Sequence, residues 1–198
     1  MFRDVLADFG VGELRDNEIA SYTHDWASLA GVGLDTQQIK SFAAAARRLA
    51  SERLAGAPLH DGALDMLARL RNDGKLTGTV TSTNRPIFDS LMKDHPLLGL
   101  MDVMVARGDV ATYKPDPAGI HRALELLDVP EPAHHAAVYI GDKDTDILAA
   151  HNAGIGSALF FPENHHELYD REALEALHPG AIILRWSEFF TTPVPKQL

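Results

Sequence analysis

The sequence of 198 residues contains no cysteine, which excludes disulfide bonds, thiolate metal sites and cysteine nucleophiles and leaves the redox compartment undetermined. Basic residues are also few, because 18 lysines and arginines stand against 28 aspartates and glutamates. The formal net charge is −10, and Arg47-Arg48 is only an isolated basic pair. Since nucleic acids and anionic membrane surfaces are bound by basic patches, neither is an expected partner.

Long apolar runs are missing too. No stretch approaches the length of a membrane-spanning helix, and residues 1–10 lack the apolar core of a signal peptide. No Gly-x-Ser-x-Gly serine motif occurs, and the histidine pairs 134–135 and 165–166 lack the spacing of metal ligands, so we assign them to loops. With 45% apolar residues the chain suits a globular fold, and we expect a soluble cytoplasmic protein.

The clearest signal is the stretch 136–154, which predicts a strand, an acidic turn and a helix. Its apolar run 136–140 is typical of a parallel strand that is covered on both faces. A mostly apolar helical stripe follows the turn. Asp142 would then lie at the carboxyl end of the strand and Asp146 in the first turn of the helix, at the edge where open α/β sheets bind ligands.

Carboxylates at this edge suit Mg²⁺, because hard cations prefer oxygen ligands and a helix N-terminus favours negative charge. A calcium loop of the EF-hand type is excluded, since Ile147 and Ala153 occupy the positions that require glycine and glutamate. Capping of the helix is the simpler role for an aspartate, and we assign it to Asp144. For Asp142 together with Asp146 we predict a magnesium site.

The first 57 residues indicate helices only. Apolar residues at helical spacing predict three amphipathic helices, over 2–9, 16–29 and 35–54. Gly31 and Gly33 should end the second, and Asp35 with Gln38 resembles a capping box for the third. The pattern changes near Pro58, so we predict a helical cap over 1–57 and a second domain over 58–198.

The second domain alternates strands and helices. Short apolar runs predict five strands, over 76–82, 101–106, 136–140, 157–161 and 181–184. A helix over 167–177 is expected before the last strand, and the tail from Thr191 should be loose. Such alternation is typical of a doubly wound parallel sheet, so the predicted fold class is α/β, a Rossmann-like core with an N-terminal helical cap.

Further polar residues follow the predicted strands. Thr83 and Asn84 come directly after the strand 76–82 and carry donors that suit a phosphate, although a threonine before a helix is more often its cap. Lys114 stands in a turn rich in proline. An isolated lysine is normally a solvated charge, but beside carboxylates and a phosphoryl group it would offset their repulsion.

Three motifs occur in order at the ends of successive predicted strands, namely Thr83-Asn84, Lys114-Pro115-Asp116-Pro117 and Gly141-Asp142 with Asp146. Together they resemble motifs two, three and four of the haloacid dehalogenase superfamily, and most of all its phosphoglycolate-phosphatase-like members, from about Pro58 onward. The resemblance implies that Thr83 and Asn84 bind the phosphoryl group and that Lys114 orients and neutralises it. It also implies that Asp142 and Asp146 hold Mg²⁺, which argues against the dehalogenase branch.

The first motif of that family is missing. Its nucleophile is the first aspartate of Asp-x-Asp-Gly-Thr, at the end of an apolar first strand that lies between the strands leading to motifs two and four. The nearest candidate, Asp8 to Gly12, has glycine in place of the second aspartate and lies in a segment of helical period. We therefore expect the first strand to be absent, with Asp8 as the one remaining substitute for the nucleophile.

Two functions compete on this basis. The first is a Mg²⁺-dependent phosphatase-like hydrolase of small phosphorylated metabolites whose chain, as given, begins after its first motif. The second is a catalytically silent module that binds phosphate or metal, or regulates another protein. A partner, for instance a second copy in a homo-oligomer, could also supply the missing strand. The substrate is not indicated, because the cap helices carry no residues that name a metabolite.

Overall fold

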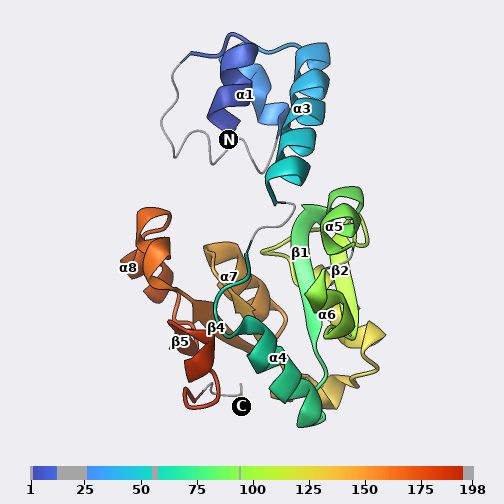
Figure 1. The fold of residues 1–198 in the computed structure, drawn as a ribbon, viewed down its shortest axis with the longest axis vertical. Helices are drawn as coiled ribbons and strands as arrows, with labels where there is room; N and C mark the ends of the chain where they lie inside the picture. The colour runs from blue at the N-terminus through green and yellow to red at the C-terminus, as the bar shows by residue number, and fades with distance from the viewer. Residues whose placement is uncertain (1, 13–25, 55–57, 94, 194–198) are drawn as a thin grey trace. The chain divides into compact units, whose positions relative to one another are not determined.

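The computed structural model describes residues 2–12, 26–54, 58–93 and 95–193 (Figure 1). The chain divides into two compact units, Met1–Ala57 and Pro58–Leu198. No helix in the described ranges is long and apolar enough to cross a membrane.

The N-terminal unit is helical. It contains α1 (Phe2–Asp8), the 3-10 helix η1 (Trp26–Val32) and α3 (Thr36–Leu54). Their apolar faces meet in a core of Val5, Leu6, Leu29, Leu34, Phe42 and Ala46. The predicted capping box is confirmed, because Asp35 and Gln38 each accept the other's backbone N–H with a side-chain oxygen.

Other predictions for this unit need correction. Most of the helix expected over 16–29 falls outside the described residues, and its described end is a 3-10 helix. Gly31 does not end that helix; the turn comes at Gly33, whose φ of +94° is a conformation that only glycine adopts without strain. Asp8 is the exposed last residue of α1, so it ends a helix and not a strand.

The second unit alternates strands and helices, as predicted. Its strands are β1 (Gly78–Asn84), β2 (Val103–Arg107), β3 (Val138–Gly141), β4 (Gly156–Phe160) and β5 (Ala181–Ile183). Its α-helices are α4 (Ala63–Asn72), α5 (Arg85–Met92), α6 (Ala118–Leu126), α7 (Asp144–Asn152) and α8 (Arg171–Glu175). Its described residues also form the short 3-10 helices η2 (Pro96–Gly99), η3 (Glu131–Ala136), η4 (Glu163–Glu167) and η5 (Trp186–Glu188).

The single helix predicted over 167–177 is wrong. The 3-10 helix η4 ends at Glu167, and α8 begins only at Arg171. The reason is local, because the carboxylate of Asp170 accepts the N–H of Ala173 and starts a new helix as its N-cap.

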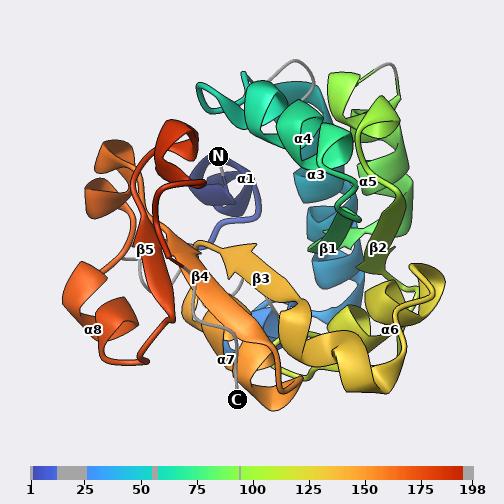
Figure 2. The same ribbon diagram turned by 90° about the horizontal axis from the view of Figure 1, so that it is seen from below.

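Every strand pair is parallel. β1 pairs with β2, and β3, β4 and β5 pair in that order (Figure 2). Within the described ranges no strand pairs β1 with β3, so the sheet is divided into two parts. The division lies between β1, which contains Thr83, and β3, which is followed by Asp142. This is the place where the resemblance implies a missing first strand.

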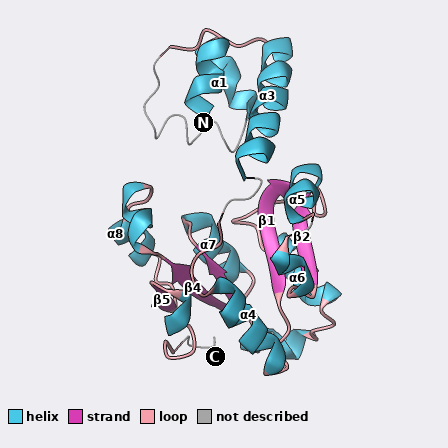
Figure 3. Cartoon of the chain, in the orientation of Figure 1, coloured by secondary structure: helices cyan, strands magenta, loops and turns pink. Residues whose placement is uncertain are grey.

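Helices cover both parts of the sheet (Figure 3). α5 and α6 pack on β1 and β2, and α7 packs on β3 and β4. All residues of β4 are buried, whereas all residues of β3 are only half-buried. Because interior strands of parallel sheets are normally enclosed, β3 has the exposure of an edge strand.

Candidate active site

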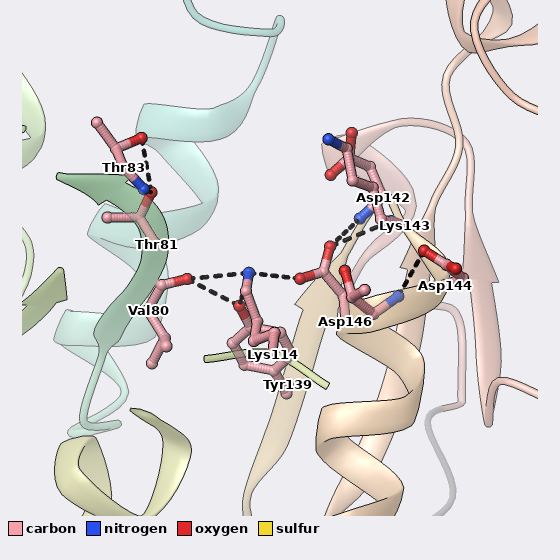
Figure 4. Close-up of polar contacts among 10 residues, drawn as sticks. Val80, Thr81, Thr83, Lys114, Tyr139, Asp142, Lys143, Asp144 and Asp146 are labelled. Atoms are coloured by element: carbon pink, nitrogen blue, oxygen red, sulfur yellow. Dashed lines mark hydrogen bonds and ion pairs between the residues drawn. The ribbon is translucent and has the colours of Figure 1, made fainter. Parts of the chain in front are cut away.

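The carboxyl ends of β1 and β3 carry the residues that sequence analysis selected, and Lys114 lies between them (Figure 4). It comes from the loop between β2 and α6. Its Nζ donates to Asp146 Oδ1 at 2.5 Å, to the Tyr139 hydroxyl at 2.9 Å and to the Val80 carbonyl at 3.4 Å. Only 13% of the Lys114 side chain and 6% of the Asp146 side chain are exposed, so this ion pair is largely removed from water.

The electrostatics of this cluster favour a charged lysine. Burial by itself lowers the pKa of Lys114, but Tyr139 and Asp146 together raise that pKa above the ordinary 10.5. Burial also raises the pKa of Tyr139 to about 12. The phenol therefore stays protonated at neutral pH, and its O–H donates to the Val80 carbonyl at 2.8 Å.

Asp146 has a second set of contacts. Its Oδ2 accepts the backbone N–H groups of Asp142 and Lys143, each at 3.1 Å, as one half of a capping box in which Lys143 is the N-cap. Asp144, for which we predict the capping role, is exposed and, among the described residues, accepts only the N–H of its neighbour Thr145. Asp146, and not Asp144, therefore caps the N-terminus of α7, and it also forms an ion pair with Lys114.

The position of Asp146 depends on Gly141. A side chain at Gly141 would overlap Asp146, so we expect Gly141→Ala to displace the carboxylate and to lower the free energy of unfolding by about 3 kcal/mol. Gly99→Ala is the matched control, because a Cβ there would meet nothing within 4 Å. Urea unfolding of both variants measures the effect, and equal stability of the two would refute the close approach.

Asp142 directly follows β3 and is half-buried. Burial of Tyr169, together with the negative charge of Asp142, raises the pKa of that tyrosine. His165 lies beside Tyr169, with ring centroids 5.6 Å apart. It is buried, its Nδ1 has no hydrogen-bond partner among the described residues, and burial lowers its pKa.

The histidines assigned to loops lie in short helices. His134 and His135 belong to η3, and His165 and His166 belong to η4. In the described ranges no group of three or more His, Asp or Glu side chains is arranged to hold a metal. Mg²⁺, however, is usually held by one or two carboxylates, with water and substrate phosphate as the other ligands. Asp142 and Asp146 provide two carboxylates at a helix N-terminus, which fits that requirement.

Thr83 and Asn84 lie across the sheet division, at the end of β1 and not after it. The register of β1 with β2 shifts between Val80 and Asn84, an irregularity of the kind that re-aims side chains. The Thr83 hydroxyl accepts a hydrogen bond from the Thr81 hydroxyl, and Asn84 occupies the N-cap of α5 without capping it through its side chain. The structure thus brings Lys114, Asp142 and Asp146 together, with Thr83 and Asn84 on the facing strand.

Tyr139 is the residue that sequence reasoning missed. It stands in an apolar run, and the pattern predicts for it only a buried position of the strand. The available signal was chemical, because a tyrosine hydroxyl inside a buried strand normally needs a hydrogen-bond partner. Here it has two partners, Lys114 and Val80.

A hollow of about 730 Å³ lies elsewhere, at the ends of β4 and β5. Its lining includes Asp61, Glu163 and Glu167 against Arg171 and Arg185. Both arginines are already paired, with Glu175 and Glu188. None of the predicted site residues lines this hollow.

Solved structures share this fold and confirm the predicted parallel-sheet α/β class. The predicted phosphoglycolate phosphatase from Haemophilus somnus superposes with a TM-score of 0.76 at 18% identity, over 96% of this chain and 87% of that one. CbbY from Rhodobacter sphaeroides, solved in complex with phosphate, gives a TM-score of 0.71 at 21% identity, over 95% and 86%.

Sequence comparison gives the family. The model of the haloacid dehalogenase-like hydrolases matches residues 1–160, so the chain belongs to this family. The validoxylamine A 7'-phosphate phosphatase of Streptomyces hygroscopicus is 38% identical over 95 residues, 48% of this chain and 43% of the relative. Pyrophosphatase PpaX of Bacillus cereus is 31% identical over 125 residues, 63% and 54%. The chain therefore spans about half the length of these relatives.

Proposed function

We propose that this chain forms the phosphate- and magnesium-binding part of a phosphatase-like hydrolase that acts on small phosphorylated metabolites. One observation carries the proposal: Lys114 and Asp146 form a nearly buried ion pair beside Asp142, in a chain of the haloacid dehalogenase-like hydrolase family. A buried cation at the carboxyl edge of a parallel sheet is suited to an anionic ligand.

Each residue has a role in this proposal. The Lys114 ammonium offsets the negative charge of the phosphoryl group, and the hydroxyl of Thr83 and amide of Asn84 donate to its oxygens from the facing strand. Asp142 and Asp146 would hold Mg²⁺, which when bound supplies further positive charge at the phosphate. Because three contacts already fix Lys114, little freedom of this side chain is lost on binding.

The divided sheet supports a second part of the proposal, a parallel strand that joins β1 to β3. Both strands run in the same direction, and β3 is half-buried along its whole length. In this chain the Val80 carbonyl of β1 accepts hydrogen bonds from the side chains of Tyr139 and Lys114. By resemblance, the added strand would carry the nucleophilic aspartate, whose attack divides phosphoryl transfer into two easier steps.

The binding part of the proposal can be tested with this chain alone. Calorimetric titration with inorganic phosphate should give saturable binding that is tighter when Mg²⁺ is present, because metal and phosphate share charge and ligands. Phosphate binding that is indifferent to Mg²⁺ would remove the metal from the proposal. A chain that binds no phosphate under either condition would contradict the proposed site as a whole.

A further inference from the structure

Arg85 is the first residue of α5 and directly follows Thr83 and Asn84, the proposed phosphate donors at the end of β1. Its guanidinium donates through Nε, at 3.2 Å, and through Nη2 to the two carboxylate oxygens of Asp109. Asp109 lies just after β2, in the segment that leads to Lys114. We propose that Arg85 and Asp109 are positioning residues, which fix the donors of β1 relative to the end of β2. This inference rests on the proposed function and names the contact that shapes the donor side of its site.

The end of β1 depends on such a contact because its pairing with β2 is irregular. The first part of β1 pairs in register with β2, but the register shifts between Val80 and Asn84. A regular ladder sets the direction of each side chain, whereas an irregular one leaves that direction to other contacts. Asn84 is the register partner of Arg107, the last residue of β2, so the donors stand beside the segment that contains Asp109.

Asp109 is itself bound to the end of β2. Its Oδ2 accepts the backbone N–H of Ala106 at 2.8 Å, and its own backbone N–H donates to the Ala106 carbonyl at 3.1 Å. The hydrogen bond from Arg85 lowers the pKa of the Asp109 carboxyl, so the pair stays charged at neutral pH. One carboxylate therefore connects the last turn of backbone in β2 with the first residue of α5, which packs on both strands (Figure 1).

The hydrogen bonds of Arg85 argue against a direct contact with phosphate. A guanidinium has five N–H donors, and Arg85 forms four hydrogen bonds. Two go to Asp109, one goes to Asp89 at 3.1 Å and one to the Met104 carbonyl at 2.9 Å. The paired contacts to Asp109 also fix the plane of the guanidinium, which a single contact does not. Arg85 thus uses its charge and most of its donors within the protein.

Stabilisation of α5 is the competing explanation, because Arg85 also pairs with Asp89 inside that helix. Asp89→Asn is therefore the matched control for Asp109→Asn. The side chains of Asp89 and Asp109 are 59% and 27% exposed, so neither variant leaves a buried polar group without water. Each variant removes one negative charge, which by itself favours an anionic ligand. A loss of phosphate affinity in Asp109→Asn alone is then an effect of position.

Titration with inorganic phosphate in the presence of Mg²⁺ tests the inference. Asp109→Asn should weaken phosphate binding about tenfold, the usual effect of one lost hydrogen bond to a charged group, whereas Asp89→Asn should change it less than about twofold. In an Arg85→Gln background, Asp109→Asn should have less than about a twofold further effect, because the two residues act as a unit. Tighter binding in Asp109→Asn would overturn the inference, since the released Arg85 would then be a direct ligand. Unchanged affinity or additive losses would overturn it too.

Amide hydrogen exchange gives a second measurement that needs no phosphate. Peptides that cover residues 81–85 should exchange several-fold faster in Asp109→Asn, while peptides from β4 and α7 should keep the wild-type rate. Faster exchange throughout the second unit would show a loss of overall stability and would refute the positioning role, as would an unchanged rate over 81–85. If the wild type bound no phosphate, the proposed function would fail, while exchange over 81–85 would still decide whether Asp109 fixes the end of β1.

Discussion

Lys114→Met should lower the free energy of unfolding by about 3–5 kcal/mol, the usual cost of removing one partner of a buried ion pair. The carboxylate of Asp146 would remain buried without its cation, held only by two backbone N–H groups. Since whole domains are stable by only about 5–15 kcal/mol, this is a large part of the total. Phosphate affinity should fall at least about 100-fold, because the site loses its buried cation.

Urea unfolding and calorimetry measure these effects, with Lys75→Met as the control, because Lys75 is exposed. Alkaline pH provides an independent check. The pKa of Lys114 is raised above 10.5 in the folded chain, so its contribution to stability is complete below that pH and is lost as the pH rises through the raised value. The wild type should therefore lose stability more steeply above pH 10.5 than Lys114→Met. If the free energy of unfolding fell with pH equally steeply in the wild type and in Lys114→Met, the result would argue against the buried ion pair.

Asp142→Asn should abolish the effect of Mg²⁺ on phosphate binding and leave the fold intact. Asparagine has the shape of aspartate, but it lacks the negative charge that favours binding of a hard cation. Because loss of an outer-shell partner alone costs about 10–100-fold in metal affinity, removal of a direct ligand should cost at least about 100-fold.

The control for this variant is Asp144→Asn. Asp144 lies two positions further along the chain, is exposed and accepts a hydrogen bond from the Thr145 amide, so its replacement should not change the Mg²⁺ titration. Equal Mg²⁺ dependence in Asp142→Asn and in the wild type would show that the metal, if bound, is held elsewhere. An equal loss of the Mg²⁺ effect in Asp142→Asn and Asp144→Asn would indicate an effect of overall charge and not of a specific metal ligand.

Much of the fold was predictable because its strongest signals are local. The apolar runs located every strand of the described chain within a short distance of its true bounds, and Asp35 with Gln38 located the start of α3. The wrong predictions of helix ends also have local causes. Asp170 started a new helix where a continuous one was expected, and Gly31 stayed inside η1 because one glycine costs a helix only about 1 kcal/mol.

The site was predictable only in part. Carboxyl ends of parallel strands share one edge of a sheet, which is why Lys114 and Asp146 could be expected near each other although 31 residues lie between them in sequence. The role of Tyr139 was not predictable from periodicity, because a phenol in a strand satisfies the apolar pattern whether or not its hydroxyl is used. The sequence predicts Asp144 as the cap of α7, whereas the structure shows Asp146 in that role. Sequence alone does not say which aspartate side chain bends back toward the helix N-terminus.

The proposed function is a phosphatase-like site for which the described residues provide no strand with the nucleophile. Hydrolysis of an aryl phosphate with Mg²⁺ tests it most directly, comparing this chain with one extended at its N-terminus by an apolar strand that ends in Asp-x-Asp-Gly-Thr. Turnover should occur in the extended chain alone and disappear from its Asp142→Asn variant. Robust and equal hydrolysis by both chains, abolished by Asp142→Asn in each, would contradict the claim, because the nucleophile would then lie within residues 1–198.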